Sequence, residues 1–196
     1  MAKVAMRGTI IEDPPVARFL FSSTAMSWVW LIARLYMGYE WIDASMHKIN
    51  NPAWIKTGLA VKSFWQAALT APGGQHPVIA YGWYGDFIRF LLATNSYTWI
   101  GKLVAYGELT LGIALVLGVF VGVSAFFGAL LNWNYMMAGT ASTNPMLLVI
   151  ALLLILAWKT AGYIGLDYYL LPAIGTPWKP GRLFGVPPKK AHPLPA

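Results

Sequence analysis

Ionisable side chains interrupt an otherwise apolar stretch near the start of the chain. The stretch from Trp28 to Asn50 contains Arg34, Glu40 and Asp43. It has about the ~20 residues that a helix needs to cross a bilayer. An ionisable group at that depth costs several kcal/mol unless it is paired, hydrated or neutralised. We therefore expect these three side chains to meet partners from other helices.

Helical periodicity divides the polar residues of this stretch between two faces. Residues at i, i+4, i+7 and i+11 share one face, and these are Tyr36, Glu40, Asp43 and His47. The second face carries Arg34, Gly38, Trp41, Ser45 and Lys48. The pattern predicts that the polar groups on the two faces contact two different neighbouring helices.

Two later apolar stretches carry polar residues that could pair with those of the first stretch. Glu108 lies near the centre of one stretch, and small residues on the same face allow another backbone to approach closely; these are Gly101, Ala105 and Gly112. Asn132 and Tyr135 share a stripe of the next stretch. Together the faces predict a polar seam inside a bundle, formed by Arg34, Glu40, Glu108, Asn132 and Tyr135.

Two interpretations of this seam remain open. In the first, Arg34 forms a buried ion pair with Glu108 or Glu40, and Asn132 hydrogen-bonds between helices, so that the seam only fixes helix register. In the second, the same residues bind a polar headgroup such as that of a quinone while a carboxylate relays protons. The candidate catalytic residues are then Glu108, Glu40 and His47.

Several other cofactor chemistries are disfavoured. The chain has no Cys, which excludes disulfides, iron–sulfur ligation and thiolate metal sites. Glu40, Asp43 and His47 suggest metal ligands, but di-metal bundles repeat Glu-x-x-His pairs and this chain has none, so we predict no metal. We also predict no haem, because His76 and His192 fall in a loop and a tail. The many Trp and Tyr residues are more typical of interfacial anchors than of a quinone stack.

Composition indicates an integral membrane protein. The chain is 58% hydrophobic and 11% charged, with a mean hydropathy of +0.56. Its net charge of +7 does not predict nucleic-acid binding, because the basic residues flank the apolar stretches. They lie before the first span (Lys3, Arg7, Arg18) and at or after the end of the last (Lys159, Lys179, Arg182, Lys189, Lys190).

This charge distribution predicts a multi-pass protein of the inner (cytoplasmic) membrane with both termini in the cytoplasm. Lys48, Lys56, Lys62 and Arg89 in the long connection after the first span oppose that orientation. A signal peptide is the competing interpretation of the N-terminus. However, Arg34 interrupts its apolar run and no small-residue cleavage site follows, so we expect the segment to be retained.

The predicted fold is an all-α integral membrane protein, a four-helix transmembrane bundle with interfacial helices between spans 1 and 2. Residues 1–25 form a polar segment, and residues 26–168 form the membrane domain. Its spans are expected at about 27–47, 97–117, 119–139 and 145–165. Interfacial helices are expected over Trp54–Leu69 and Val78–Ala93, separated by a Pro/Gly turn. Residues 169–196 form a Pro-rich basic tail on the membrane surface.

Four pieces of the sequence resemble the DoxX family, and its DoxD branch in particular. They are RLYMGYEWIDASMHKI in the first span, NPAWIKTG after it, GELTLGIALVLG in the second span, and AGTASTNPMLLVIALLLILAWKTAGYIGLDYYLLP toward the end. The resemblance covers roughly residues 28 to 172, and the last piece is the most specific. Family-like positions include Arg34, His47, Lys48, Glu108 and the GTAS-TNP loop, but no catalytic role transfers to any of them.

The resemblance implies a four-helix membrane protein and, for the DoxD branch, the membrane subunit of a thiosulfate:quinone oxidoreductase that works with a DoxA-like partner. Its cofactor would be a quinone, and an anionic donor would approach an outer side formed by His47, Lys48 and the loop after Gly139. Lys56 and Lys62 would attract that anion. The alternative is a noncatalytic scaffold or accessory subunit of a larger respiratory or photosynthetic membrane complex. In either case its partners are the lipid bilayer and other membrane subunits.

Overall fold

The computed structural model describes residues 13–70 and 78–176, and all regular structure within them is helical. The elements are α1 (Pro15–Ser22), the short 3-10 helix η1 (Thr24–Met26), α2 (Ser27–Ile49), α3 (Pro52–Ile55), α4 (Leu59–Leu69), α5 (Gly82–Ala93), α6 (Tyr97–Leu117), α7 (Val121–Met137), α8 (Asn144–Leu156) and α9 (Asp167–Ile174). The predicted turn between Pro72 and Pro77, the first twelve residues and most of the basic tail lie outside the described residues.

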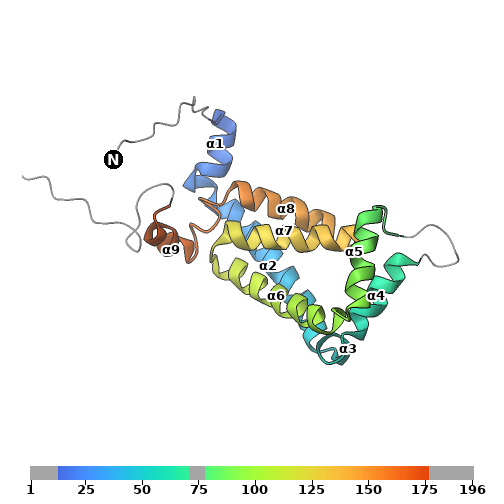
Figure 1. Ribbon diagram of the computed structural model, residues 1–196. Helices are drawn as coiled ribbons and strands as arrows, with labels where there is room; N and C mark the ends of the chain where they lie inside the picture. Colours follow the sequence, from blue (N-terminus) through green and yellow to red (C-terminus); the bar gives the residue numbers. More distant parts are fainter. Residues whose placement is uncertain (1–12, 71–77, 177–196) are drawn as a thin grey trace, which may run out of the picture.

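Four helices form an elongated bundle. Figure 1 shows α2, α6, α7 and α8 side by side, with α1 and α9 at one end and α3, α4 and α5 at the other. Within the bundle, α2 packs chiefly on α6, and α7 chiefly on α8. The bundle therefore consists of two closely packed pairs, with fewer contacts between α6 and α7.

Glycines set the register of the α2–α6 pair. A Cβ added at Gly112 would lie 2.8 Å from the carbonyl oxygen of Gly38 and 2.7 Å from Cγ1 of Ile42. Ser45 Oγ adds a hydrogen bond of 2.8 Å to the carbonyl oxygen of Ala105. The two backbones thus approach more closely than any side chain would permit.

We expect Gly112→Ala to destabilise the protein by about 1–3 kcal/mol, the usual cost of overpacking. The matched control is Gly107→Ala in the same helix, because no atom lies within 4 Å of a Cβ placed at Gly107. That control should gain stability by about 0.5–1 kcal/mol, since Gly is a poor helix residue. Thermal unfolding in one detergent measures both variants. Equal shifts in the same direction would contradict the proposed packing.

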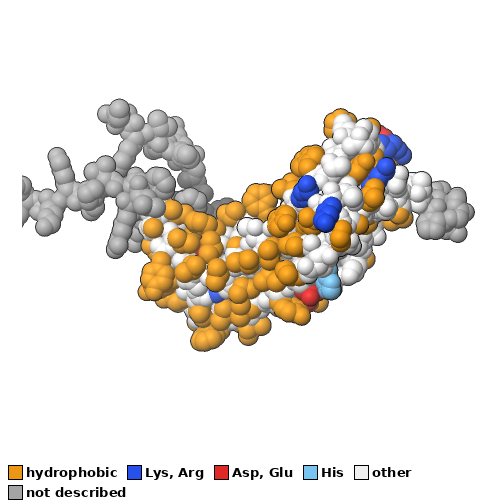
Figure 2. Space-filling model, turned by 90° about the horizontal axis from the view of Figure 1, so that it is seen from below, with side chains coloured by type: hydrophobic (Ala, Val, Ile, Leu, Met, Phe, Trp, Pro, Cys, Tyr) orange, Lys and Arg blue, Asp and Glu red, His pale blue; other side chains and the backbone are white. Residues whose placement is uncertain are grey.

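The outer faces of the bundle are strongly apolar. In the view of Figure 2, hydrophobic side chains cover the bundle, whereas Lys and Arg side chains gather toward the end that carries α3, α4 and α5. Among the described helices, α6 is by itself long and apolar enough to cross a membrane. The segments Pro15–Ser22 and Thr24–Ile49 qualify only when taken together across a bend of 56°. Helix α8 is also apolar, but with 13 residues it is shorter than the 18 residues required of a candidate span.

Helix bounds agree with several expectations and correct others. The helix expected over Val78–Ala93 begins at Gly82, and the third span is shorter, Val121–Met137. Helix α6 has the bounds predicted for the second span, and a tight turn at Gly118 joins it to α7, as expected. The helix predicted over Trp54–Leu69 is instead divided into α3 and α4, because Gly58 adopts a left-handed conformation with φ +70°. Its Cβ position would clash with the backbone of Tyr97, which only Gly avoids.

The fourth helix is shorter than predicted. It ends at Leu156, and turns occupy most of the chain from there to Asp167. Gly162 lies directly against the side chain of Asp167, and a Cβ at Gly165 would lie 2.9 Å from the carbonyl oxygen of Leu117. These contacts require the chain to leave the helix and fold back over the turn between α6 and α7.

Candidate functional site

Glu108 forms the centre of a buried polar cluster contributed by three helices. Its side chain on α6 is fully buried, as the small residues around it predicted. Lys48 Nζ of α2 lies 2.6 Å from its Oε2 atom, and the hydroxyl of Tyr135 on α7 donates a hydrogen bond of 2.6 Å to its Oε1 atom. Both oxygens of the carboxylate are therefore paired, one with an ammonium group and one with a phenol.

Aromatic rings enclose the ammonium group of Lys48. Nζ lies 5.4 Å from the ring centroid of Trp54 and 5.6 Å from that of Tyr135, within the range of cation–π attraction. Trp54 reaches this position because α2 ends at Ile49 and the Asn51 side chain accepts the N–H of Ala53 to begin α3. The Lys48 side chain is 15% exposed, so its charge is shielded by the carboxylate and two rings.

Arg34 does not pair with Glu108 or Glu40, contrary to the first of the two interpretations of the seam. Arg34 is 1% exposed and donates 2.7 and 2.8 Å hydrogen bonds to the carbonyl oxygens of Leu115 and Val116, and a third to that of Ile164. The antiparallel register of α2 and α6 explains this, because it places Arg34 at the end of α6 and Lys48 near Glu108. The predicted seam is thus divided between two ends of the bundle.

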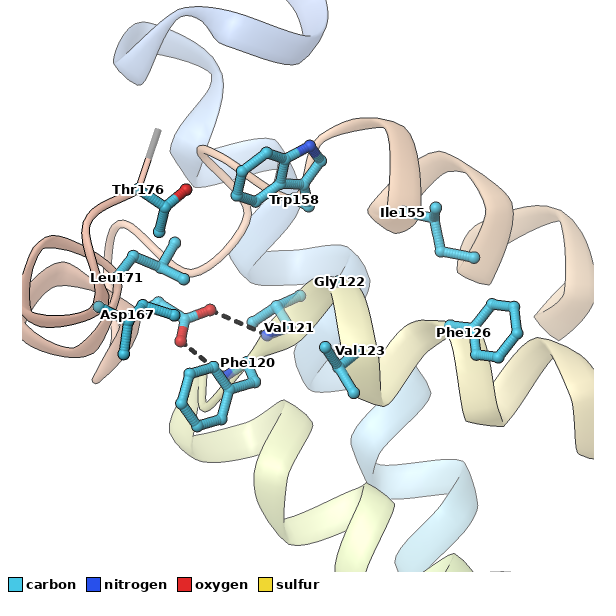
Figure 3. Close-up of a pocket in the computed structure, with 11 residues that line it drawn as sticks. Phe120, Val121, Gly122, Val123, Phe126, Ile155, Trp158, Asp167, Leu171 and Thr176 are labelled. Carbon is cyan, nitrogen blue, oxygen red and sulfur yellow. Dashed lines mark hydrogen bonds between the residues drawn. The ribbon is translucent and has the colours of Figure 1, made fainter. Parts of the chain in front are cut away.

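Asp167 completes the junction at the Arg34 end, shown in Figure 3. Its carboxylate accepts hydrogen bonds of 2.6 and 2.8 Å from the backbone N–H groups of Phe120 and Val121, where α7 begins. Burial raises the pKa of this carboxyl group, while those two N–H groups and nearby Arg34 act in the opposite direction. Beside it, an apolar cavity of about 370 Å³ extends between α7, α8 and α9, with Trp158 and Leu171 in its wall.

The face of α2 that carries Glu40, Asp43 and His47 does not pack against another described helix. Asp43 and His47 are exposed and lie 3.6 Å apart, and His47 is 81% exposed at its side chain. Glu40 is partly exposed and Tyr36 exposed on the same side. Glu40 and His47 are therefore not part of the Glu108 cluster. Lys48, which was expected beside His47 on the outer side, instead turns inward and pairs with buried Glu108.

Asn132 is fully buried one turn before Tyr135, but it does not bridge helices as expected. Neither its Oδ1 nor its Nδ2 atom has a hydrogen-bond partner among the described residues, and the same is true of Trp41 Nε1. Trp41 faces α7 close to this position, since a Cβ at Gly128 would lie 3.3 Å from its Nε1 atom. Buried polar groups generally have partners, so these three atoms are exceptions among the described residues.

An aromatic pocket of about 260 Å³ opens beside the cluster. Helices α4, α5, α6 and α7 contribute its wall, which includes Phe64, Trp65, Tyr84, Trp99 and Tyr135. Tyr84 donates a 3.1 Å hydrogen bond to the carbonyl oxygen of Asn134, and burial raises the pKa of its hydroxyl group. Tyr135 therefore belongs both to this pocket and to the Glu108 cluster. Such mostly apolar pockets with a few convergent polar groups are typical of small-molecule sites.

Chemically, the cluster is a short chain of proton-carrying groups. A phenol, a carboxylate and an ammonium group follow one another from the pocket wall inward, each within hydrogen-bond distance of the next. Such a chain can pass a proton between a ligand in the pocket and Lys48. Arg34, by contrast, contacts backbone carbonyls and has a structural role.

Sequence reasoning missed the roles of three residues. Lys48 was visible as the basic residue at the far end of the buried stripe with Arg34 and Ser45, but its partner could not be chosen without the helix register. Trp54 had no signal beyond its position after the helix-ending Asn-Pro pair. Asp167 gave no sign that it would cap a helix 46 residues earlier.

The described residues contain no group of three or more His, Asp or Glu side chains that could hold a metal ion. Comparison with family models, with curated proteins and with solved structures gives no match for this chain.

Proposed function

We propose that this chain is a DoxX-like membrane subunit that binds a quinone and supplies protons for its reduction. The observation that carries the proposal is the position of Tyr135, which lines the aromatic pocket and donates a hydrogen bond to buried Glu108. The proposal also draws on the resemblance of residues 28 to 172 to the DoxD branch.

The exposed surface supports a bundle of four membrane-spanning helices. Large apolar side chains are exposed along all four bundle helices, among them Ile32, Leu103, Phe126 and Leu152. In water such a surface would be unfavourable, whereas lipid covers it without cost. Both α2 and α8 have one end near α1 and α9, which fits both termini on one side, and the basic terminal residues favour the cytoplasmic side of an inner membrane.

The chemical groups in the pocket wall suit the ring of a quinone. A quinone ring is flat and apolar except for its carbonyl oxygens, which accept hydrogen bonds. The wall of the pocket is mostly aromatic and aliphatic. The hydroxyl of Tyr135 donates its hydrogen bond to Glu108, and on binding it would turn from that carboxylate to a carbonyl oxygen of the quinone. Because Tyr84 is held by Asn134, Tyr135 is the hydroxyl group that connects the pocket to an ionisable cluster.

Reduction of a quinone to a quinol consumes two electrons and two protons. In the proposed function, the two electrons come from an anionic sulfur donor such as thiosulfate, which is oxidised as it passes them through a DoxA-like partner. Tyr135 delivers protons to the pocket and is reprotonated from Glu108 and Lys48. Exposed Lys56 adds positive charge at the end of the bundle where the donor would approach.

Quinone binding by the purified protein tests this function. Trp65 and Trp99 line the pocket, so a quinone without a tail should quench tryptophan fluorescence in a saturable manner. Tyr135→Phe removes the hydrogen bond that its hydroxyl would donate to the quinone. Because such a bond contributes about 1 kcal/mol, the variant should bind the quinone about three- to tenfold more weakly. The matched control is Tyr169→Phe, which should leave the affinity unchanged. Tyr169 is exposed and does not line the pocket, and its helix α9 lies at the opposite end of the bundle from α4 and α5 (Figure 1).

The assembled complex distinguishes the redox subunit from a scaffold. With the partner present, Glu108→Gln should retain assembly and lose quinone reduction. A wild-type protein that binds no quinone would contradict the proposed function, and a complex that keeps full turnover with Glu108→Gln would favour the noncatalytic scaffold.

A further inference from the structure

A long apolar groove runs along the outside of the bundle between α6 and α7. Its volume is about 660 Å³, and it extends along α6 from Lys102 to Leu111, facing Phe127 and Leu130 of α7. The groove is open to the exterior, since Leu103 is 62% exposed and Phe127 is 50% exposed. Its wall is almost wholly apolar and therefore favours a hydrocarbon occupant.

The groove follows from how the bundle is paired. Helix α6 packs closely on α2 through Gly112, and α7 packs closely on α8, so fewer side chains fill the space between α6 and α7. Gly107 widens this space, because no atom lies within 4 Å of a Cβ placed there. A residue with a side chain would fit the helix equally well but would fill the groove.

The groove is continuous with the aromatic pocket. Leu103, Val104 and Leu131 line both of them. Starting at Tyr135, a molecule would therefore meet a polar group, then aromatic rings, and then an apolar path along α6. These surfaces match, in the same order, the polar atoms, the ring and the hydrocarbon tail of an amphiphile that has a ring at one end.

The length of the groove suits a chain that spans part of a membrane leaflet. Nine residue steps separate Lys102 from Leu111, and at about 1.5 Å per residue they cover about 14 Å. Half of the hydrocarbon core of a bilayer is about 15 Å thick. The groove leads from the end of the bundle rich in Lys and Arg, seen in Figure 2, toward the middle of the helices.

We propose that the groove between α6 and α7 holds the isoprenoid tail of a long-chain quinone whose ring occupies the aromatic pocket. This inference rests on the proposed quinone site and goes beyond it, because it names membrane quinones with long tails as the ligand class. The tail would contact Leu103, Leu111 and Phe127, and the notch at Gly107 would give it room.

Filling the groove tests the inference. Gly107→Leu places a side chain in the groove without a clash, and Leu130→Trp fills it from the opposite wall. Each variant should weaken binding of a quinone with an isoprenoid tail by about tenfold or more, since even one excluded methylene group changes affinity by about that factor. Binding of a tailless quinone with the same ring should change less than about twofold. Fluorescence quenching measures both ligands in the same detergent.

The control is Gly82→Leu at the start of α5, because Gly82 also has no atom within 4 Å of its Cβ position and does not line the groove. It should bind both quinones as the wild type does, and thermal unfolding should show that all variants are folded.

The outcomes separate the tail groove from the quinone site itself. If the wild type does not bind the tailless quinone, the proposed function fails. If it binds that quinone but neither groove variant weakens binding of the tailed one, the tail groove is wrong while the ring site stands. Loss of a copurifying phospholipid from the groove variants, with unchanged affinity for the tailed quinone, would assign the groove to lipid and would also overturn the inference.

Discussion

Replacing Lys48 with Met should destabilise the protein by about 3–5 kcal/mol, the usual cost of removing one partner from a buried ion pair. Glu108 is fully buried, so without the ammonium group its charge would have only the hydroxyl of Tyr135 as a partner. Met keeps most of the volume of the Lys side chain, which limits the effect of packing. Thermal unfolding of the purified protein in one detergent measures the change.

A double variant shows whether the loss comes from the unpaired carboxylate. Lys48→Met combined with Glu108→Gln should recover most of the stability, because a neutral amide is far less costly to bury than a charge. Lys56→Met, at an exposed position on the same end of the bundle, should change stability by less than about 0.5 kcal/mol. Equal destabilisation by the single and double variants would show that Lys48 acts through packing and not through Glu108.

The second large effect is expected at the other end of the bundle. Arg34→Met should destabilise the protein by about 3 kcal/mol, because the carbonyl groups of Leu115, Val116 and Ile164 lose a charged donor. It also removes the positive charge close to Asp167. Arg34→Lys should recover only part of the loss, since a single ammonium group cannot reproduce the planar guanidinium group that reaches three acceptors.

Arg89→Met provides the comparison for Arg34. Arg89 pairs with Asp86 at 2.6 Å, but both side chains are mostly exposed, so its loss should change the unfolding midpoint little. A destabilisation by Arg34→Met no greater than that by Arg89→Met would contradict the structural role of the carbonyl contacts. Quinone binding should survive in folded Arg34 variants, because Arg34 does not line the aromatic pocket.

Periodicity predicted the bounds of α6 and one buried face of α2. The spacing of Arg34, Gly38, Trp41 and Ser45 placed these residues on one face of α2, and the structure buries all four of them. The small residues around Glu108 correctly indicated an inward carboxylate. Both predictions depend only on the geometry of a single helix, which the sequence determines locally.

The pairing of charges could not be predicted in the same way. Arg34 and Lys48 lie on one face, and either could reach Glu108 if α2 and α6 were shifted along each other. The contact between Gly38 and Gly112 decides the register, and it depends on the shapes of two helices together. Similarly, the end of α8 at Leu156 depends on Asp167 and Ile164 reaching other helices, which local propensity does not reveal.

The aromatic pocket also lay beyond sequence reasoning. The sequence favours interfacial anchors as the general interpretation of its many Trp and Tyr residues, and that interpretation suits each residue taken alone. In the fold, α4 and α5 stand across the end of the bundle and bring Trp65 and Tyr84 around Tyr135. Only the tertiary arrangement distinguishes a pocket wall from a set of anchors.

Photolabelling with an azidoquinone most directly tests whether the pocket beside Tyr135 is a quinone site. The purified protein is illuminated with the label, and mass spectrometry identifies the modified peptides. The predicted labels lie in residues 64–65, 84–91, 99–104 and 131–138, and an excess of unlabelled quinone should abolish them. Labels confined to the cavity beside Asp167, at Phe120 or Leu171, or labels that excess quinone does not displace, would contradict a quinone site at Tyr135 and Glu108.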